Sequence, residues 1–287
     1  MEIIDSHQHF WKVGLFDYPW MSADLGVLYR DYLPGTLAPI LRRNGVAGTV
    51  LVQASNSLRE SRWLMSLADR TEFIKGVVGW VDLADPSVGQ QINELAANPK
   101  FKGVRHLVES ETDDGWLVQA SVLAGLKTLA ANRLSYDLLV HTRHLPYART
   151  VAETCPDLML VVDHMAKPSI ATHAISQWAG ELKQLASFPN VHCKLSGLVT
   201  EANHASWNTD DLRPFVECAV ELFGPERLMF GSDYPVCLLA ATYDRVLESF
   251  QELLKDLDED ERSRIFSGNA RKFYKLGSQG EVVAAST

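Results

Sequence analysis

Short runs of apolar and β-branched residues recur along the chain, and each run ends in polar residues. This pattern is typical of strands, and helical patterns fill the intervals between the runs. The candidate strands are EIIDSHQH at 2–9, GTVLVQ at 48–53, IKGVVGWV at 74–81, FKGVRH at 101–106, SYDLLVH at 135–141, LMLVVDH at 158–164, VHCKLS at 191–196 and RLMFGSD at 227–233.

The intervals carry helix signals. One helix is expected over 58–69 behind Ser57, which can cap it, and others are expected over 120–132, 145–153, 173–186 and 212–223. Strands that alternate with helices pair in parallel through right-handed crossovers, and eight such units close a barrel. The sequence therefore predicts an α/β fold, a (β/α)₈ TIM barrel; an open doubly wound sheet is the alternative.

No internal repeat and no low-complexity linker marks a second domain, so we expect one barrel domain over residues 1–276. The segment 15–34 is rich in Tyr, Trp and Asp and is longer than most βα loops. It is expected either to fold over the barrel mouth or to serve as a structural cover. Residues 277–287 are expected to form a loose C-terminal tail.

Composition and charge narrow the possible partners. With 46% hydrophobic and 22% charged residues among 287, the chain has the composition of a folded globular protein. Its net charge of −9 and pI near 5.5 argue against nucleic acid or anionic membrane as partners. Four cysteines without CxxC spacing predict a reducing, cytoplasmic compartment. A small molecule is the expected partner, and the sequence does not specify an oligomeric state.

The residue types that carry out chemistry lie at the ends of the predicted strands. Because the loops after parallel barrel strands meet at one rim, these side chains are expected to converge there. They are His7, His9, Gln53, Trp80, Arg105, His106, His141, His164, Lys194 and Asp233.

His7 and His9 project to the same face if they lie on one strand, because side chains alternate with a period of two. Together with His164 or His141 and with Asp233, they could hold one divalent ion and leave a position for water or substrate. On spacing alone, a pair of hydrogen-bonded strand histidines is the more common explanation. Their place at a barrel rim favours the metal site.

Asp233, in the sequence GSDYP, could bind a metal, take a proton from water, or cap the next turn. Arg105 and Lys194 bring cations to the rim that suit a carboxylate or a developing oxyanion, unless they form structural ion pairs. Asp163 is expected to point away from His164 and to play a supporting role.

With these motifs in place, the chain resembles the amidohydrolase superfamily, in the metal-dependent branch that contains sugar-acid lactonases acting on L-fucono- and L-rhamnono-lactones. The resemblance runs nearly end to end. It rests on DSHQHFW at 5–11, FKGVRH at 101–106, LVVDHMAKP at 160–168, GPERLMFGSDYPV at 224–236 and GNARKFY at 268–274.

The resemblance implies a barrel rim that holds the histidines at 7, 9, 141 and 164, with Asp233 activating the water that attacks a lactone carbonyl. It also implies substrate contacts from Gln53, Trp80, Arg105 and Lys167. The cofactor expected is one divalent metal ion, zinc by preference, which some relatives of this type do without. A second ion is not expected, since the fourth strand ends in Arg105-His106.

The activity expected is hydrolysis of an aldonic-acid lactone in sugar catabolism. One alternative on the same scaffold is metal-dependent, non-oxidative decarboxylation of an aromatic or unsaturated acid. Another, from a different class, is a catalytically silent barrel that binds a sugar acid.

Overall fold

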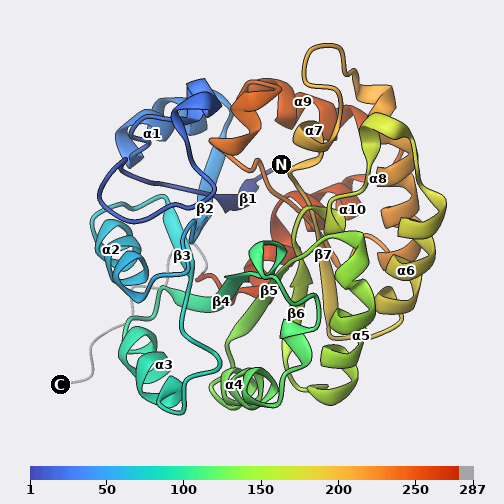
Figure 1. Cartoon of the computed structure of the whole chain (residues 1–287). Coiled ribbons are helices and arrows are strands. Elements are labelled where there is room, and N and C mark those ends of the chain that lie inside the picture. The colour runs from blue at the N-terminus through green and yellow to red at the C-terminus, as the bar shows by residue number, and fades with distance from the viewer. Residues whose placement is uncertain (278–287) are drawn as a thin grey trace.

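Eight parallel strands form the centre of the computed structural model, which describes residues 1–277, and helices surround them as an outer ring (Figure 1). Each strand pairs with the next one in chain order. The sheet curves until Gln8 forms a parallel bridge with Tyr234, which brings the last strand beside the first. The predicted (β/α)₈ barrel is confirmed.

Strands and α-helices alternate along most of the described chain. The strands are β1 Ile3–Gln8, β2 Val46–Val52, β3 Ile74–Gly79, β4 Phe101–Leu107, β5 Ser135–Leu139, β6 Met159–Val162, β7 Val191–Leu195 and β8 Leu228–Phe230. The α-helices are α1 Pro34–Arg43, α2 Leu58–Asp69, α3 Val88–Ala96, α4 Ala120–Ala131, α5 Leu145–Thr154, α6 Ser176–Ala186, α7 Leu198–Glu201, α8 Thr209–Phe223, α9 Tyr243–Leu253, α10 Glu259–Ser263 and α11 Asn269–Phe273.

Every predicted strand and helix overlaps an observed one, but several strands end earlier than their predicted runs. Among them, β6 stops at Val162 and β8 at Phe230. His164 and Asp233 follow with positive φ angles of 53° and 56°. An extended strand requires negative φ, so both side chains leave the barrel on turns beyond the strand ends.

The barrel interior is filled from the strands and closed at one end by the C-terminal segment. Inward-facing aliphatic side chains such as Val50, Val52 and Met229 pack with Phe273 and Tyr274, at the end of α11 and just after it. A second and larger apolar layer lies between the strands and the helices. This arrangement leaves the opposite end of the barrel open to the loops that follow the strands.

A fully buried group of charges lies inside the same barrel. Lys194 Nζ is 2.6 Å from Asp137 Oδ2 and 2.9 Å from Asp163 Oδ1, and none of the three side chains is exposed. The Tyr274 hydroxyl donates to Asp137 Oδ2 at 2.7 Å, so the C-terminal segment contacts this ion pair directly. Removing one partner of such a buried pair would leave an uncompensated charge.

The segment 15–34 lies at the barrel mouth, as one of its two predicted arrangements requires. Trp20 Nε1 donates to the Ala54 carbonyl at 2.7 Å, and Ser55 Oγ donates to the Asp17 carbonyl at 2.7 Å. Among residues 1–277, no helix is long and apolar enough to cross a membrane. The predicted tail falls, from residue 278 on, outside the described residues.

Glu60 on α2 fixes the loop that holds Trp20. Its carboxylate accepts hydrogen bonds from the backbone N–H groups of Ala54 at 3.1 Å and Ser55 at 2.9 Å. Burial raises the pKa of Glu60 from its ordinary value of 4.5 to about 8, although both N–H groups favour the charged form. Between about pH 4.5 and 8, the carboxyl group therefore keeps its proton in the folded protein, whereas the unfolded chain releases it.

This proton makes stability depend on pH. Between about pH 4.5 and 8 the folded state binds more protons at Glu60 than the unfolded state, so wild-type stability should fall with rising pH relative to Glu60→Gln. We expect the difference in free energy of unfolding between wild type and Glu60→Gln to change by on the order of a few kcal/mol across this window and to level off above it. Urea unfolding at stepped pH measures it. A difference that is constant with pH, or rises, would contradict the assignment.

Candidate active site

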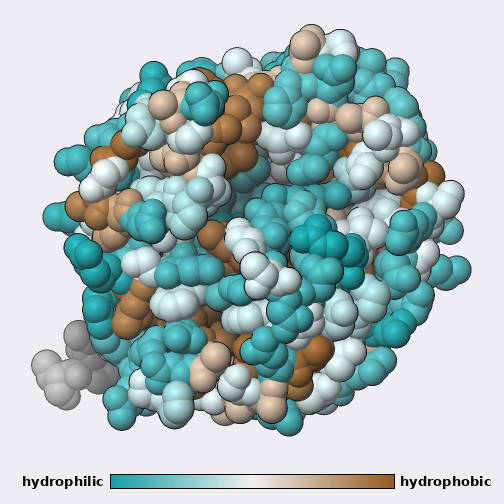
Figure 2. All heavy atoms as spheres, in the orientation of Figure 1, coloured by the Kyte–Doolittle hydropathy of each residue, from teal (hydrophilic) through white to brown (hydrophobic). Residues whose placement is uncertain are grey.

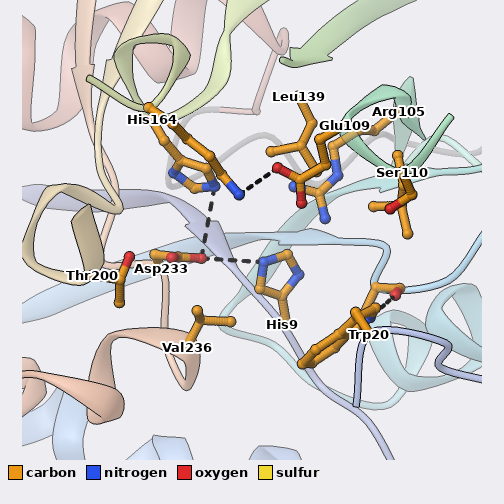
Figure 3. A pocket seen from close by; sticks show the side chains of 13 residues that line it. His9, Trp20, Arg105, Glu109, Ser110, Leu139, His164, Thr200, Asp233 and Val236 are labelled. Carbon is orange, nitrogen blue, oxygen red and sulfur yellow. Dashed lines mark hydrogen bonds and ion pairs between the residues drawn. The ribbon is translucent and has the colours of Figure 1, made fainter. Parts of the chain in front are cut away.

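A pocket opens at the barrel mouth, where the loops after the strands meet (Figure 3). On the space-filling view, this face is hollowed near its centre, with polar residues on most sides of the hollow and an apolar strip above it (Figure 2). Predicted site residues share the pocket with residues from other loops and strand ends. Its lining consists of His9, Trp20, Ala54, Arg105, Leu107, Glu109, Ser110, Leu139, His164, Lys167, Thr200, Asp233 and Val236.

His7 on β1 and His9, one residue past the end of β1, meet as predicted, with 3.1 Å between their Nε2 atoms. Lys194 Nζ lies 3.1 Å from His7 Nδ1 and Arg105 Nη1 lies 3.2 Å from His7 Nε2, so a cation that can only donate faces each nitrogen of this ring. His9 Nδ1 donates to the Val52 carbonyl at 2.8 Å, because a carbonyl only accepts. The proton of neutral His9 therefore sits on Nδ1.

Unusual backbone conformations position His164. Four successive residues, His164 to Lys167, have φ between 51° and 61°. Left-handed conformations cost L-residues roughly 1–2 kcal/mol each, so the turn persists only because surrounding contacts hold it. Gly197 gives the ring its space, because a Cβ there would lie 2.5 Å from His164 Nδ1. The ring nitrogen Nδ1 also lies 2.8 Å from Ser196 Oγ.

Asp233 is held from below by Asp5, a residue that sequence analysis did not single out. Asp5 accepts hydrogen bonds from Ser232 N at 2.9 Å, Ser232 Oγ at 2.6 Å and the Tyr243 hydroxyl at 3.1 Å. The Asp233 N–H donates to the His7 carbonyl at 2.8 Å. The loop after β8 is therefore fastened to β1, and the carboxylate faces the histidines.

The electrostatics favour an ionised Asp233 among neutral imidazoles. Asp233 Oδ1 lies 3.3 Å from His9 Nε2 and 3.9 Å from His164 Nε2. Burial opposes ionisation, but the protonated forms of His164 and His9 outweigh it at low pH and hold the pKa of Asp233 below 3.8. Burial lowers the pKa of His164 to about 4, with Lys167 and Arg105 adding to the shift, and the pKa of His9 is also lowered by burial. A negative oxygen thus faces uncharged nitrogens.

Arg105 closes the side of the pocket next to His7. Its Nη1 donates to Asp163 Oδ2 at 3.1 Å and lies 3.2 Å from His7 Nε2, and its Nη2 donates to the Gln53 carbonyl. Asp163 itself points into the barrel rather than away from His164, because the left-handed turn begins directly after it. Its carboxylate compensates both Arg105 and Lys194.

The donor set can hold one metal ion. One ligand atom from each of His7, His164 and Asp233 lies within 4.8 Å of the others. Neutral imidazoles with an ionised carboxylate are the ligands that divalent transition metals prefer. Asp163 Oδ1 lies 3.4 Å from His7 Nδ1, where it could accept the proton of a metal-bound imidazole. The Arg105 cation beside His7 works against a divalent ion at this site.

Six predicted site residues, His7 among them, lie beside or beneath the pocket instead of lining it. Gln53 donates to the Arg105 carbonyl at 3.1 Å, and Lys194 contacts His7 from inside the barrel. Trp80 Nε1 donates to His106 Nδ1 at 3.0 Å, and the His106 ring stacks on Trp116. His141 Nε2 lies 3.7 Å from Glu109 Oε2. Contact of these residues with substrate stays a prediction.

Sequence reasoning missed several pocket residues, of which Glu109 is the most polar. It lies two residues after the end of β4, so the rule that reactive residues follow strand ends could have found it. Ser110, Thr200 and the apolar Leu107, Leu139 and Val236 carried no comparable signal. Which neutral residues face a pocket depends on how each loop folds.

Comparison with known proteins gives close relatives over almost the full length. An L-fucono-1,5-lactonase of Burkholderia ambifaria is 40% identical over 279 residues, which cover 95% of each chain. An L-fucono-1,5-lactonase of Burkholderia multivorans is 40% identical over 284 residues, covering 95% of this chain and 96% of its own.

The fold and the family agree with these relatives. The crystal structure of an amidohydrolase from Burkholderia multivorans with bound zinc superposes with a TM-score of 0.92 at 40% identity, covering 96% of this chain and all of that chain. The model of the amidohydrolase family matches residues 4–276. The chain therefore belongs to the amidohydrolase family.

Proposed function

We propose that this protein hydrolyses a sugar-acid lactone, with L-fucono-lactone as the first substrate to test, and that it acts in the cytoplasm. The observation that carries the proposal is a buried carboxylate, Asp233, that shares one pocket with His9, His164 and the cations of Arg105 and Lys167. Relatives that are 40% identical and carry the name L-fucono-1,5-lactonase support it.

Asp233 acts as the general base. It takes a proton from a water molecule, whose oxygen then attacks the lactone carbonyl carbon. When the tetrahedral intermediate collapses, the bond to the ring oxygen breaks and that oxygen takes the proton from Asp233, which regenerates the base and leaves an open-chain hydroxy acid. Because the pKa of Asp233 is below 3.8, the basic form is present throughout the neutral range.

The cations stabilise the charge that develops on the carbonyl oxygen. Arg105 is held by Asp163 and by the Gln53 carbonyl, so its guanidinium is in place before substrate arrives. Lys167 lines the same pocket and offers a second cation. A lactone is a cyclic ester, and an ester is hydrolysed more easily than an amide. The site therefore has to lower the barrier less for a lactone than it would for an amide.

A divalent metal ion, zinc by preference, would be held by His7, His164 and Asp233, with His9 beside them. When bound, such an ion supplies a Lewis acid that polarises a carbonyl or lowers the pKa of water. Without a metal ion, the residues of this chain still supply the base, the orienting contacts and two cations.

Replacement of the base is the most direct test. Asp233→Asn should lower kcat by roughly 10³-fold or more while the protein stays folded, because the amide cannot take a proton from water. The readout is a pH-indicator assay over L-fucono-, L-galactono-, D-arabinono- and L-rhamnono-lactones. Asp210→Asn, the same change at an exposed residue of α8, is the control. Near-normal turnover by Asp233→Asn would remove Asp233 from the role of base, and CO₂ release without hydroxy acid would indicate decarboxylation.

Metal binding is tested separately from activity. The wild-type chain should bind one equivalent of Zn²⁺ by calorimetry, and His164→Asn should weaken that binding by about 10-fold or more, since it removes one of three ligands. More than one tightly bound ion, or binding unchanged by His164→Asn, would contradict this site. Chelation followed by assay then decides dependence: lost activity that Zn²⁺ restores makes the ion essential, whereas unchanged activity assigns the histidines to orienting substrate.

A further inference from the structure

Glu109 lines the pocket but has no part in the mechanism above. It follows β4 and lies on the same side of the pocket as Leu139 and Arg105, whereas Thr200 and Val236 lie on the other side (Figure 3). About a quarter of its side chain is exposed, 23%, in contrast to 4% for Asp233. A ligand in the pocket can therefore reach the carboxylate.

The two oxygens of Glu109 differ in their surroundings. Oε2 pairs with Lys167 Nζ and lies 3.7 Å from His141 Nε2. Oε1 accepts no hydrogen bond from residues 1–277 and is not among their buried unpaired polar atoms. Burial opposes ionisation, but Lys167, His141 and His164 outweigh it and hold the pKa of Glu109 below 4.5. One negatively charged acceptor is thus left accessible beside the site.

Apart from Glu109 and Asp233, the pocket lining has only neutral acceptors, such as the hydroxyl groups of Ser110 and Thr200. Arg105 and Lys167 only donate hydrogen bonds, and Asp233 is committed to the attacking water. Leu107, Leu139 and Val236 are apolar. A sugar hydroxyl that loses its water here needs a replacement acceptor, because an unpaired buried polar group is costly. The Glu109 carboxylate meets that need without taking part in proton transfer.

We propose that Glu109 is a specificity-determining residue that accepts a hydrogen bond from a hydroxyl group of the lactone ring. The inference rests on the proposed lactonase activity and deepens it. Its carboxylate selects hydroxylated, uncharged lactones, since a second negative charge would be repelled from this wall of the pocket. The ion pair with Lys167 fixes the direction of the carboxylate.

The test compares wild type and Glu109→Gln on L-fucono-lactone and on a set of analogues that each lack one hydroxyl. The variant should lose about 10-fold or more in kcat/KM on the full substrate, mostly through KM, because the amide is a weaker acceptor than a carboxylate. On one analogue, the one without the recognised hydroxyl, the loss should shrink to less than about 2-fold. Thermal unfolding checks that the variant is folded.

Glu111→Gln is the matched control, because Glu111 lies on the same loop but pairs with His106 outside the pocket lining. Its effect should be the same on every analogue. Equal losses for Glu109→Gln on all analogues would show that Glu109 only orients Lys167 and would overturn this inference alone. A wild type that turns over no lactone would overturn the proposed function and this inference with it.

Discussion

The ammonium group of Lys194, buried between Asp137 and Asp163 in the barrel, is the constraint on which the site depends. Its Nζ lies 3.1 Å from His7 Nδ1, and the other ring nitrogen of His7, Nε2, lies 3.1 Å from His9 Nε2. Asp163 extends the same group of charges to Arg105. Two cations and two carboxylates balance inside an apolar barrel, so the pairing must be complete for the charges to be tolerated.

This arrangement links distant parts of the chain. Tyr274 closes the far end of the barrel and donates to Asp137, so the C-terminal segment reaches His7 through two side chains, Asp137 and Lys194. At the mouth, Asp5 fastens the loop that carries Asp233 to β1. The strained turns at His164 and Asp233 lie between these two supports. Their conformations place both side chains over the pocket, which a regular strand end would not do.

Sequence analysis identified the pocket where residue type and strand position sufficed. His7, His9, Arg105, His164 and Asp233 were predicted and meet at one mouth, because parallel strands bring their carboxyl ends together. Gln53 and Lys194 were also at strand ends, but they support neighbours instead of facing the pocket. Trp80 and His106 contact each other. Whether such a residue faces the pocket or supports a neighbour depends on how the side chains of adjacent strands are directed. The sequence of one strand does not specify this.

The sequence by itself determined the barrel, its strand order and the reactive residue types at its mouth, since these follow from local periodicity and from the geometry of parallel strands. Only the tertiary structure decided which residues face the pocket, which nitrogen of His9 carries the proton and that Glu109 presents an accessible acceptor there. These properties depend on contacts between residues far apart in the chain, such as Lys194 with His7 and Asp5 with Ser232, and on burial that alters their charge.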